Sequence, residues 1–158
     1  MGIRYSAYPV QATDIELARR EPRHFINDNP LVGFDGPYDE WFHLDLDKSW
    51  HYLQRLFTWP HSSPAERGLE LVEGNVHYLN SGEYEPHFGV LDPDQVDQVA
   101  RAIFWTDKVD VLAMLIAENR SGDRLRDDTA YVGHHLEAAK RFTARVAEAG
   151  HGLIYSIG

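Results

Sequence analysis

The stretch from Leu44 to Thr58, LDLDKSWHYLQRLFT, predicts a capped amphipathic helix. Asp45 can act as the N-cap, because a carboxylate just before the first turn accepts hydrogen bonds from backbone N–H groups that the helix leaves without a partner. Large apolar residues then recur at helical spacing on one face: Leu46, Trp50, Leu53 and Phe57. Such a stripe is stable only when it is covered, so this helix should lie against a hydrophobic core.

Before this stretch, the sequence predicts a strand, a short helix and a long loop. Residues Ile3 to Val10 alternate in the manner of a half-buried strand. Thr13 and Glu16 have the spacing of a capping box, which should begin a short helix that Pro22 ends. From Asn27 to His43, prolines and glycines among aromatic residues predict an ordered loop.

After it, a second loop is expected from Pro60 to Gly68, and residues 69 to 79 show mixed signals. Asp92 and Pro93 form a strong helix start, because the aspartate can cap the helix and the proline fits its first position. The residues expected to face inward from this helix are Val96, Val99, Ala100, Ile103 and Phe104.

A further helix, capped by Thr106, is predicted to lie near the centre of the core. Its inward face should consist of Val109, Leu112, Ala113 and Ile116, widened by Val111 and Leu115. A polar loop from Asn119 to Thr129 should precede a last helix from Ala130 to Ala149, which Gly150 ends. The apolar positions of that last helix are Val132, Leu136, Ala139, Phe142 and Val146.

The final strand completes the prediction of the fold. Residues 153 to 157 are almost continuously apolar, which favours a place inside a sheet rather than at its edge. Helices and strands do not alternate regularly, and this pattern favours the α+β class. We therefore predict a single domain over residues 1–158, with several amphipathic helices packed on a small mixed sheet that includes the N- and C-terminal strands.

Composition excludes several classes of function. Of the 158 residues 43% are hydrophobic, as in globular proteins, and no apolar run approaches the roughly 20 residues needed to cross a bilayer. The formal net charge of −10 argues against nucleic-acid binding, which requires clustered Lys and Arg. The chain has no cysteine, which excludes thiol chemistry and favours a cytoplasmic location.

Common nucleotide-binding, zinc-protease and hydrolase motifs are absent. The sharpest catalytic hypothesis is the pair Asp47 and His51, which would share a face of the predicted helix as an acid/base pair or as two metal ligands. The alternative, which we prefer, is a surface hydrogen bond with Asp47 serving the helix dipole. No third ligand is evident, so the sequence predicts no metal site and identifies no cofactor.

Other candidates lie in loop-like contexts. Titratable groups that could join the same cleft are His77, Glu85 and His87. Tyr84 lies beside them and is a candidate binding residue. Trp41 and Trp59 are candidate binding residues as well, because tryptophan is enriched at interaction hot spots, although packing into the core is the alternative.

An acidic series accompanies the two middle helices and consists of Asp92, Asp94, Asp97, Asp107 and Asp110. Only Arg101 and Lys108 oppose it locally. Such a series is usually a solvated face, but a negative patch would also attract a basic protein partner.

The chain resembles the bacterial YfbM-like family, a domain of unknown function. The resemblance rests on the pattern L-D-hydrophobic-D-K-x-W at Leu44 to Trp50, the N-terminal Met-Gly strand, the element from Tyr84 to Val96 with its Asp-Pro-x-x-Val ending, and the closing helix and strand. Trp59-Pro60 departs from the family pattern, in which a small residue or glycine is expected. The resemblance implies a fold and assigns no activity.

Two hypotheses for function remain. The first, which we favour, is a non-catalytic module that binds a basic protein partner or a small ligand. The second is an enzyme whose acid/base or metal chemistry uses Asp47 and His51. Neither hypothesis involves nucleic acid or a membrane, and neither defines an oligomeric state.

Overall fold

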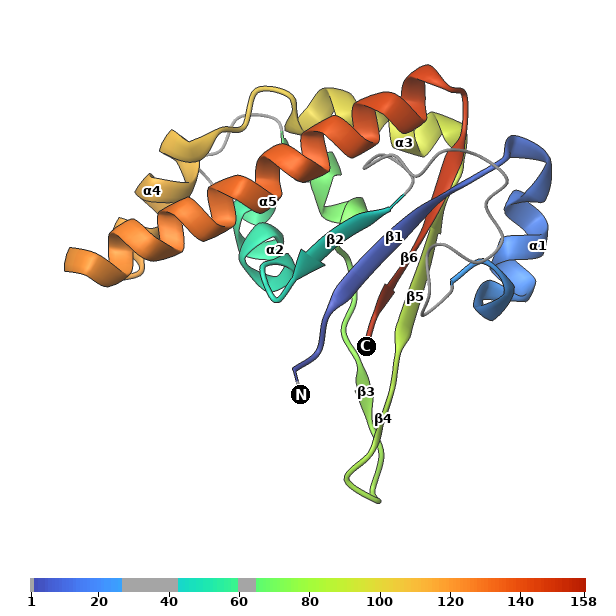
Figure 1. Ribbon diagram of the computed structural model, residues 1–158, viewed down its shortest axis with the longest axis horizontal. Coiled ribbons are helices and arrows are strands. Elements are labelled where there is room, and N and C mark those ends of the chain that lie inside the picture. Colours follow the sequence, from blue (N-terminus) through green and yellow to red (C-terminus); the bar gives the residue numbers. More distant parts are fainter. Residues whose placement is uncertain (1, 27–42, 60–64) are drawn as a thin grey trace.

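The computed structural model describes residues 2–26, 43–59 and 65–158. Its main sheet is formed by β1 (Tyr5–Val10), β2 (Leu44–Asp47), β5 (His87–Leu91) and β6 (Gly152–Ile157), in the order β2-β1-β6-β5 (Figure 1). The N- and C-terminal strands pair along their whole length, and β6 lies inside the sheet as predicted. The α+β class is confirmed, but the sheet predicted as mixed is antiparallel at each described pairing.

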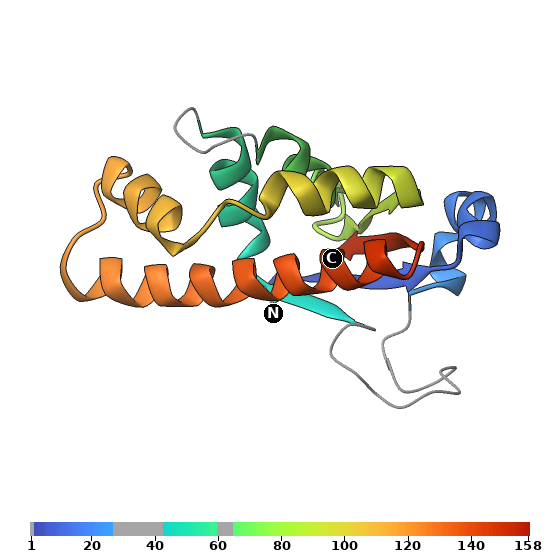
Figure 2. The ribbon, with the colours of Figure 1, turned by 90° about the horizontal axis from the view of Figure 1, so that it is seen from above.

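One face of the sheet carries the main core beneath α2 (Trp50–Thr58), α3 (Pro93–Ile103) and α5 (Gly122–Glu148). Figure 2 shows α5 running along most of the length of the molecule, with α2, α3 and α4 (Lys108–Ala117) beside it. The other face packs at one end against α1 (Ile15–Arg20), around Tyr8, Val10 and Ile154. Within the described residues, no helix is both long and apolar enough to cross a membrane.

The first part of the stretch from Leu44 to Thr58 is a strand, and this corrects the predicted helix. Leu44 and Leu46 are buried whereas Asp45 between them is exposed, which is the two-residue period of a strand. β2 pairs with β1, and the helix begins only at Trp50, with Ser49 rather than Asp45 at the N-cap position. Pairing with a neighbouring strand therefore overrides the helical spacing of Leu46.

The start of α3 agrees with the prediction, whereas the starts of α4 and α1 differ from it. α3 has a full capping box, in which Asp92 accepts from the Gln95 N–H and the Gln95 side chain accepts from the Asp92 N–H. Before α4, Asp107 is the cap instead of Thr106, which is buried. Before α1, the predicted capping box of Thr13 is replaced by a 3-10 turn, η1 (Ala12–Asp14).

Two predicted loops contain helix. η4 (Ala65–Leu71) occupies the second half of the loop expected from Pro60, whose residues 60–64 lie outside the described part, as do residues 27–42 of the first loop. α5 already begins at Gly122, within the loop predicted before Ala130. A second 3-10 turn, η2 (Pro22–His24), follows α1. A hairpin of β3 (His77–Tyr78) and β4 (Tyr84–Glu85) projects from the body (Figure 1).

The main predicted inward face of α4 is on the outside: Val109 is 70% exposed and Ile116 54% exposed, and Leu112 and Ala113 are exposed as well. Val111 and Leu115, which were predicted to widen that face, are buried together with Met114. Phe104, predicted to be buried, is 59% exposed. By contrast, all five predicted core positions of α5 are buried.

Two tyrosines connect the sheet to the last residue of η4 and to the segment that follows it. The rings of Tyr5 and Tyr155 stack with centroids 5.4 Å apart. The Tyr5 hydroxyl donates to the carbonyl oxygen of Leu71 and the Tyr155 hydroxyl to that of Glu73, each at 2.8 Å. Burial raises the pKa of both phenols, so they keep their protons and remain hydrogen-bond donors at neutral pH.

Gly89 is the position on β5 that allows this arrangement. It lies directly opposite Tyr155 in the sheet, and a Cβ atom there would collide with the Tyr155 ring. We predict that Gly89→Ala lowers the free energy of unfolding by about 2 kcal/mol or more, because overpacking displaces the ring and its hydrogen bond. Urea unfolding would measure the loss.

Gly133→Ala is the matched control for this substitution. Gly133 is buried in α5, and a Cβ atom there would lie 3.3 Å from Cγ of the flexible Lys108 side chain. This change should be neutral or stabilising, because alanine is favoured over glycine inside a helix. Equal destabilisation by the two substitutions would contradict the role given to Gly89.

Candidate functional site

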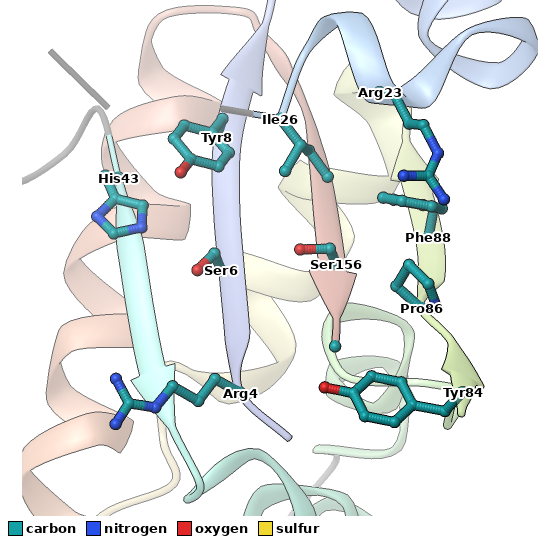
Figure 3. A pocket seen from close by; sticks show the side chains of 11 residues that line it. Arg4, Ser6, Tyr8, Arg23, Ile26, His43, Tyr84, Pro86, Phe88 and Ser156 are labelled. Carbon is teal, nitrogen blue, oxygen red and sulfur yellow. The ribbon is translucent and has the colours of Figure 1, made fainter. Parts of the chain in front are cut away.

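A pocket of about 720 Å³ lies on the sheet face that carries α1 and η2 (Figure 3). Its floor is formed by side chains of β1, β5 and β6, and η2 and β4 contribute at its edges. The described residues that line it are Arg4, Ser6, Tyr8, Arg23, Ile26, His43, Tyr84, Pro86, Phe88, Ser156 and Gly158. The sheet therefore gathers residues from both ends of the chain into one concave surface.

Strand register places polar side chains at the centre of this pocket. Ser6 and Ser156 are direct partners across β1 and β6, and Phe88 is the partner of Ser156 on β5. Directly opposed residues of an antiparallel pair point to the same face, so the two hydroxyls lie side by side. Figure 3 shows them between Arg4 on one side and Arg23 on the other.

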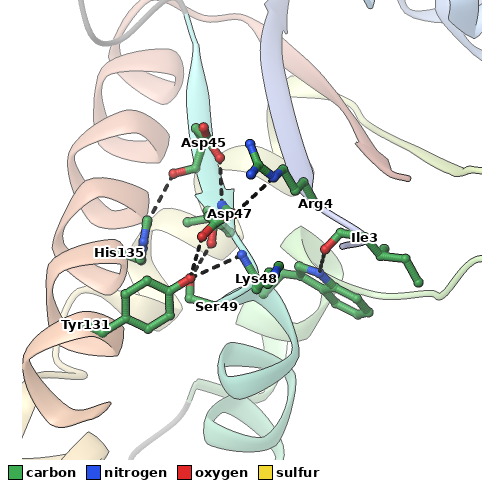
Figure 4. Close-up of polar contacts among 10 residues, drawn as sticks. Ile3, Arg4, Asp45, Asp47, Lys48, Ser49, Tyr131 and His135 are labelled. Carbon is green, nitrogen blue, oxygen red and sulfur yellow. Dashed lines mark hydrogen bonds and ion pairs between the residues drawn. The ribbon is translucent and has the colours of Figure 1, made fainter. Parts of the chain in front are cut away.

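Asp47 lies beside the pocket and is the centre of a hydrogen-bonded cluster (Figure 4). The Tyr131 hydroxyl donates to Asp47 Oδ2 at 2.9 Å, and Arg4 Nε lies 3.3 Å from Asp47 Oδ1. The Asp47 backbone N–H donates to Asp45 Oδ1 at 2.6 Å, and the Lys48 N–H donates to the Tyr131 hydroxyl oxygen at 3.2 Å. The cluster joins β2 and α5 to Arg4, the residue before β1.

The cluster explains the unusual backbone conformation of Asp47 and the lowered pKa of its carboxyl group. Asp47 has φ of +45°, a left-handed conformation that aspartate tolerates better than most residues. The hydrogen bond from Tyr131 lowers the pKa of Asp47 against the opposing effect of burial. Burial and the same hydrogen bond raise the pKa of Tyr131 to about 12, so the phenol keeps its proton and continues to donate.

Asp47 and His51 do not share a helix face, because Asp47 ends β2 and His51 belongs to α2. The His51 ring lies between Trp50 and Tyr52. Its pKa is lowered by burial and by the nearby Arg55 charge. The shared helix face predicted for an acid/base pair is therefore absent.

The other predicted titratable groups separate into two places. His77 and Glu85 are exposed cross-strand partners in the hairpin of β3 and β4. His87 lies on β5 near Tyr155, with ring centroids 6.1 Å apart, and closely approaches Gly74. Among the described residues, no three or more His, Asp or Glu side chains are grouped so as to hold a metal ion.

The three aromatic residues predicted to bind a ligand or partner lie in different parts of the chain's structure or outside its described part. Tyr84 lines the pocket of Figure 3. Trp59 packs, half-buried, against the main core. Trp41 lies outside the described residues.

The acidic series serves mainly structural roles. Asp92 caps α3, and Asp107 with Asp110 forms the capping box of α4. Asp97 forms an ion pair with Arg101 at 2.9 Å, one turn along α3. The series is therefore largely used in helix capping and local pairing.

A second concave surface lies between the C-terminal ends of α3 and α5, and we call it the α3–α5 groove. It has a volume of about 610 Å³. Its lining residues are Asp97, Ala100, Arg101, Phe104, Trp105, Ala144, Ala147 and Glu148. Phe104 and Trp105 meet edge to face, with ring centroids 4.9 Å apart, and Trp105 is 71% exposed.

Sequence reasoning missed both concave surfaces. The aromatic pair was detectable, because two large rings at the junction of two predicted helices cannot both face the core. The pocket had no signal of this kind, since its residues come from five separate parts of the sequence.

Together, a four-stranded antiparallel sheet covered by helices on one face and two surface concavities define the chain as an α+β domain. The chain belongs to the family described as Domain of unknown function (DUF1877), whose sequence model matches residues 1–156. It is similar in structure to the Escherichia coli protein of unknown function YfbM, with a TM-score of 0.59, 16% identity and 99% of each chain covered. This confirms the predicted family. No curated protein matches the chain.

The Asp47 cluster leads to a prediction about stability and its pH dependence. Tyr131→Phe should lower the free energy of unfolding at pH 7 by about 1 kcal/mol, a value reduced by solvent screening because the Asp47 side chain is 36% exposed. The folded pKa of Asp47 lies below its ordinary value of 3.8. Its contribution is therefore present above that value and is lost as the pH falls through the folded pKa.

Urea unfolding at pH 7 and pH 3 would test this prediction, and the difference between the wild-type protein and Tyr131→Phe should shrink at pH 3. Tyr52→Phe is the matched control, because the Tyr52 ring is half-buried under Arg55, 4.7 Å from its guanidinium carbon, and is not part of the cluster. A loss that stays constant between the two pH values would show that the Tyr131 hydroxyl does not act through the Asp47 carboxylate.

Proposed function

We propose that this protein is a non-catalytic cytoplasmic module that binds a protein partner through the α3–α5 groove. The observation that carries the proposal is the exposure of Phe104 and Trp105, at 59% and 71%. Adjacent exposed aromatics over a groove with small alanine side chains are typical of a site that accepts an apolar anchor. The absence of cysteine supports the cytoplasmic location.

The energetics of the groove favour a partner that covers these rings. Burying roughly 100 to 150 Å² of one aromatic side chain contributes about 3 kcal/mol. The groove runs between two helices and has Ala100, Ala144 and Ala147 along its walls, so the surface offers little obstruction to an incoming helix. An amphipathic helix laid into such a groove is a common mode of recognition.

The charge around the groove supports a basic partner. Asp97 and Arg101 in its lining pair with each other, which leaves Glu148 as the excess negative charge of the groove. The net charge of −10 adds a long-range attraction for cations, which accelerates encounter and weakens with salt. We therefore propose a partner segment with an apolar face flanked by Lys or Arg.

The contacts of Asp47 support a structural role over the enzyme hypothesis. Its carboxylate is engaged by Tyr131 and Arg4, and it joins β2 and α5 to the residue before β1. His51 has a different environment, next to Arg55. These contacts account for the lowered pKa of Asp47 without a catalytic task.

Two synthetic amphipathic helices with the same leucine face, one with lysines and one with glutamates on the polar face, would test the proposal. The lysine peptide should bind at least about tenfold more tightly, because its charge complements the groove, and should lose affinity between about 0.05 and 0.5 M salt. Trp105→Ala should weaken it by about 2 kcal/mol, or roughly thirtyfold. Isothermal titration calorimetry would give these affinities.

Tyr78→Ala is the matched control, because Tyr78 is an equally exposed aromatic residue, at 66%, on the hairpin. It should leave the affinity for the lysine peptide unchanged. Equal binding of the two peptides, or an affinity that Trp105→Ala does not change, would refute the groove as the binding site.

A further inference from the structure

We propose that the pocket on the sheet, shown in Figure 3, is a second binding site, which takes a small organic anion: a carboxylate or phosphate group carried on an apolar body. This site uses the opposite face of the sheet from the one that packs against α3 and α5. It is independent of the partner proposed for the α3–α5 groove, because the two surfaces share no lining residue.

The first observation is the sign of the charge in the pocket. The chain has 25 acidic residues against 15 Lys and Arg, yet the described lining of the pocket includes Arg4 and Arg23 and no Asp or Glu. Asp45 lies opposite Ser6 on the neighbouring strand, outside this lining, and accepts the backbone N–H of Asp47. Two guanidinium groups in a lining that has no carboxylate of its own among the described residues favour an anionic ligand over a cationic one.

The second observation concerns the hydrogen-bond donors that the arginines still offer. In the described part of the chain Arg23 forms no ion pair, and its guanidinium carbon lies 5.6 Å from the centroid of the Phe88 ring. Arg4 contacts Asp47 through Nε, which leaves the terminal nitrogens of its guanidinium group for another acceptor. Guanidinium groups match carboxylate and phosphate oxygens with paired hydrogen bonds.

The third observation is the hydroxyl pair between the two arginines. Ser6 and Ser156 are half-buried, and within the described residues neither side chain forms a hydrogen bond. Along the same face the next cross-strand pair, Tyr8 and Ile154, is buried in the small core under α1. Two hydroxyls at this point can donate to the oxygens of an anion that reaches Arg23.

The remaining lining explains why the ligand should carry an apolar body. Phe88, Tyr84, Pro86 and Ile26 present ring and aliphatic surface around the hydroxyl pair. His43 stacks on Tyr8, with centroids 4.9 Å apart, and burial lowers its pKa, so it is a neutral aromatic wall at pH 7. A volume of about 720 Å³ lies in the range of small-molecule sites.

The test is an NMR titration of the ¹⁵N-labelled full chain with phenyl phosphate and with benzoate. Benzyl alcohol is the uncharged control. The amide signals of Ser6, Phe88 and Ser156 should shift with at least one anion. Benzyl alcohol should bind at least about tenfold more weakly, because it lacks the charge that Arg23 pairs with. The comparison of the two anions shows whether the site prefers phosphate or carboxylate.

Variants connect these shifts to the pocket. Arg23→Gln should lower the affinity about tenfold, since Arg23 is exposed and its loss leaves the fold intact. Ser156→Ala should lower it by a few-fold. Arg67→Gln is the matched control, because Arg67 is an exposed arginine that pairs with Glu70 away from the pocket, and it should leave the affinity unchanged.

Several outcomes would overturn the proposal. The first is the absence of shifts at these three amides with either anion up to about 10 mM, the concentration range of weak site-specific binding. The second is equal binding of benzyl alcohol. The third is an affinity that Arg23→Gln leaves unchanged, and the fourth is a set of shifts confined to Phe104 and Trp105, which would assign the probes to the α3–α5 groove.

Discussion

The rest of the structure depends on β6, which pairs with a strand along each edge and is buried on both faces of the sheet. This strand takes hydrogen bonds from β1 on one edge and β5 on the other, so the first and last parts of the chain meet at the centre of the sheet. On the helix-covered face, Tyr155 stacks on Tyr5, and their hydroxyls fix the backbone at the end of η4 and just after it. Because these hydroxyls are buried, each needs an acceptor, and the carbonyl groups of Leu71 and Glu73 satisfy that need.

The two faces of the sheet consequently have different roles. The helix-covered face forms a continuous apolar core, in which shape and hydrogen bonding leave little freedom. Among the described residues, the other face has an apolar cluster beneath α1, and farther along the strands it presents Ser6 and Ser156 together with two arginines. A rigid sheet therefore positions a polar concavity, while the ends of α3 and α5 leave an aromatic groove elsewhere on the surface.

The corrections to the predicted fold have a common physical origin. Leu46 fits both a helical stripe and a strand alternation, and only the presence of β1 as a pairing partner selects the strand. In α4 almost every position is apolar, so spacing cannot identify the buried face, and contact with α5 and α2 selects Val111, Met114 and Leu115. In α5, where polar and apolar positions are well separated, the predicted core residues were correct.

The sequence by itself determined the α+β class, the inner position of the last strand, the cap of α3, the inward face of α5 and the family. These features depend on local chemistry and on periodicity, which are properties of neighbouring residues. Only the tertiary structure decided that Asp47 belongs to a cluster with Tyr131 and Arg4 and that Phe104 is exposed. It also brought Arg4, Arg23 and Ser156 to one pocket, because strand pairing between distant segments sets which side chains become neighbours.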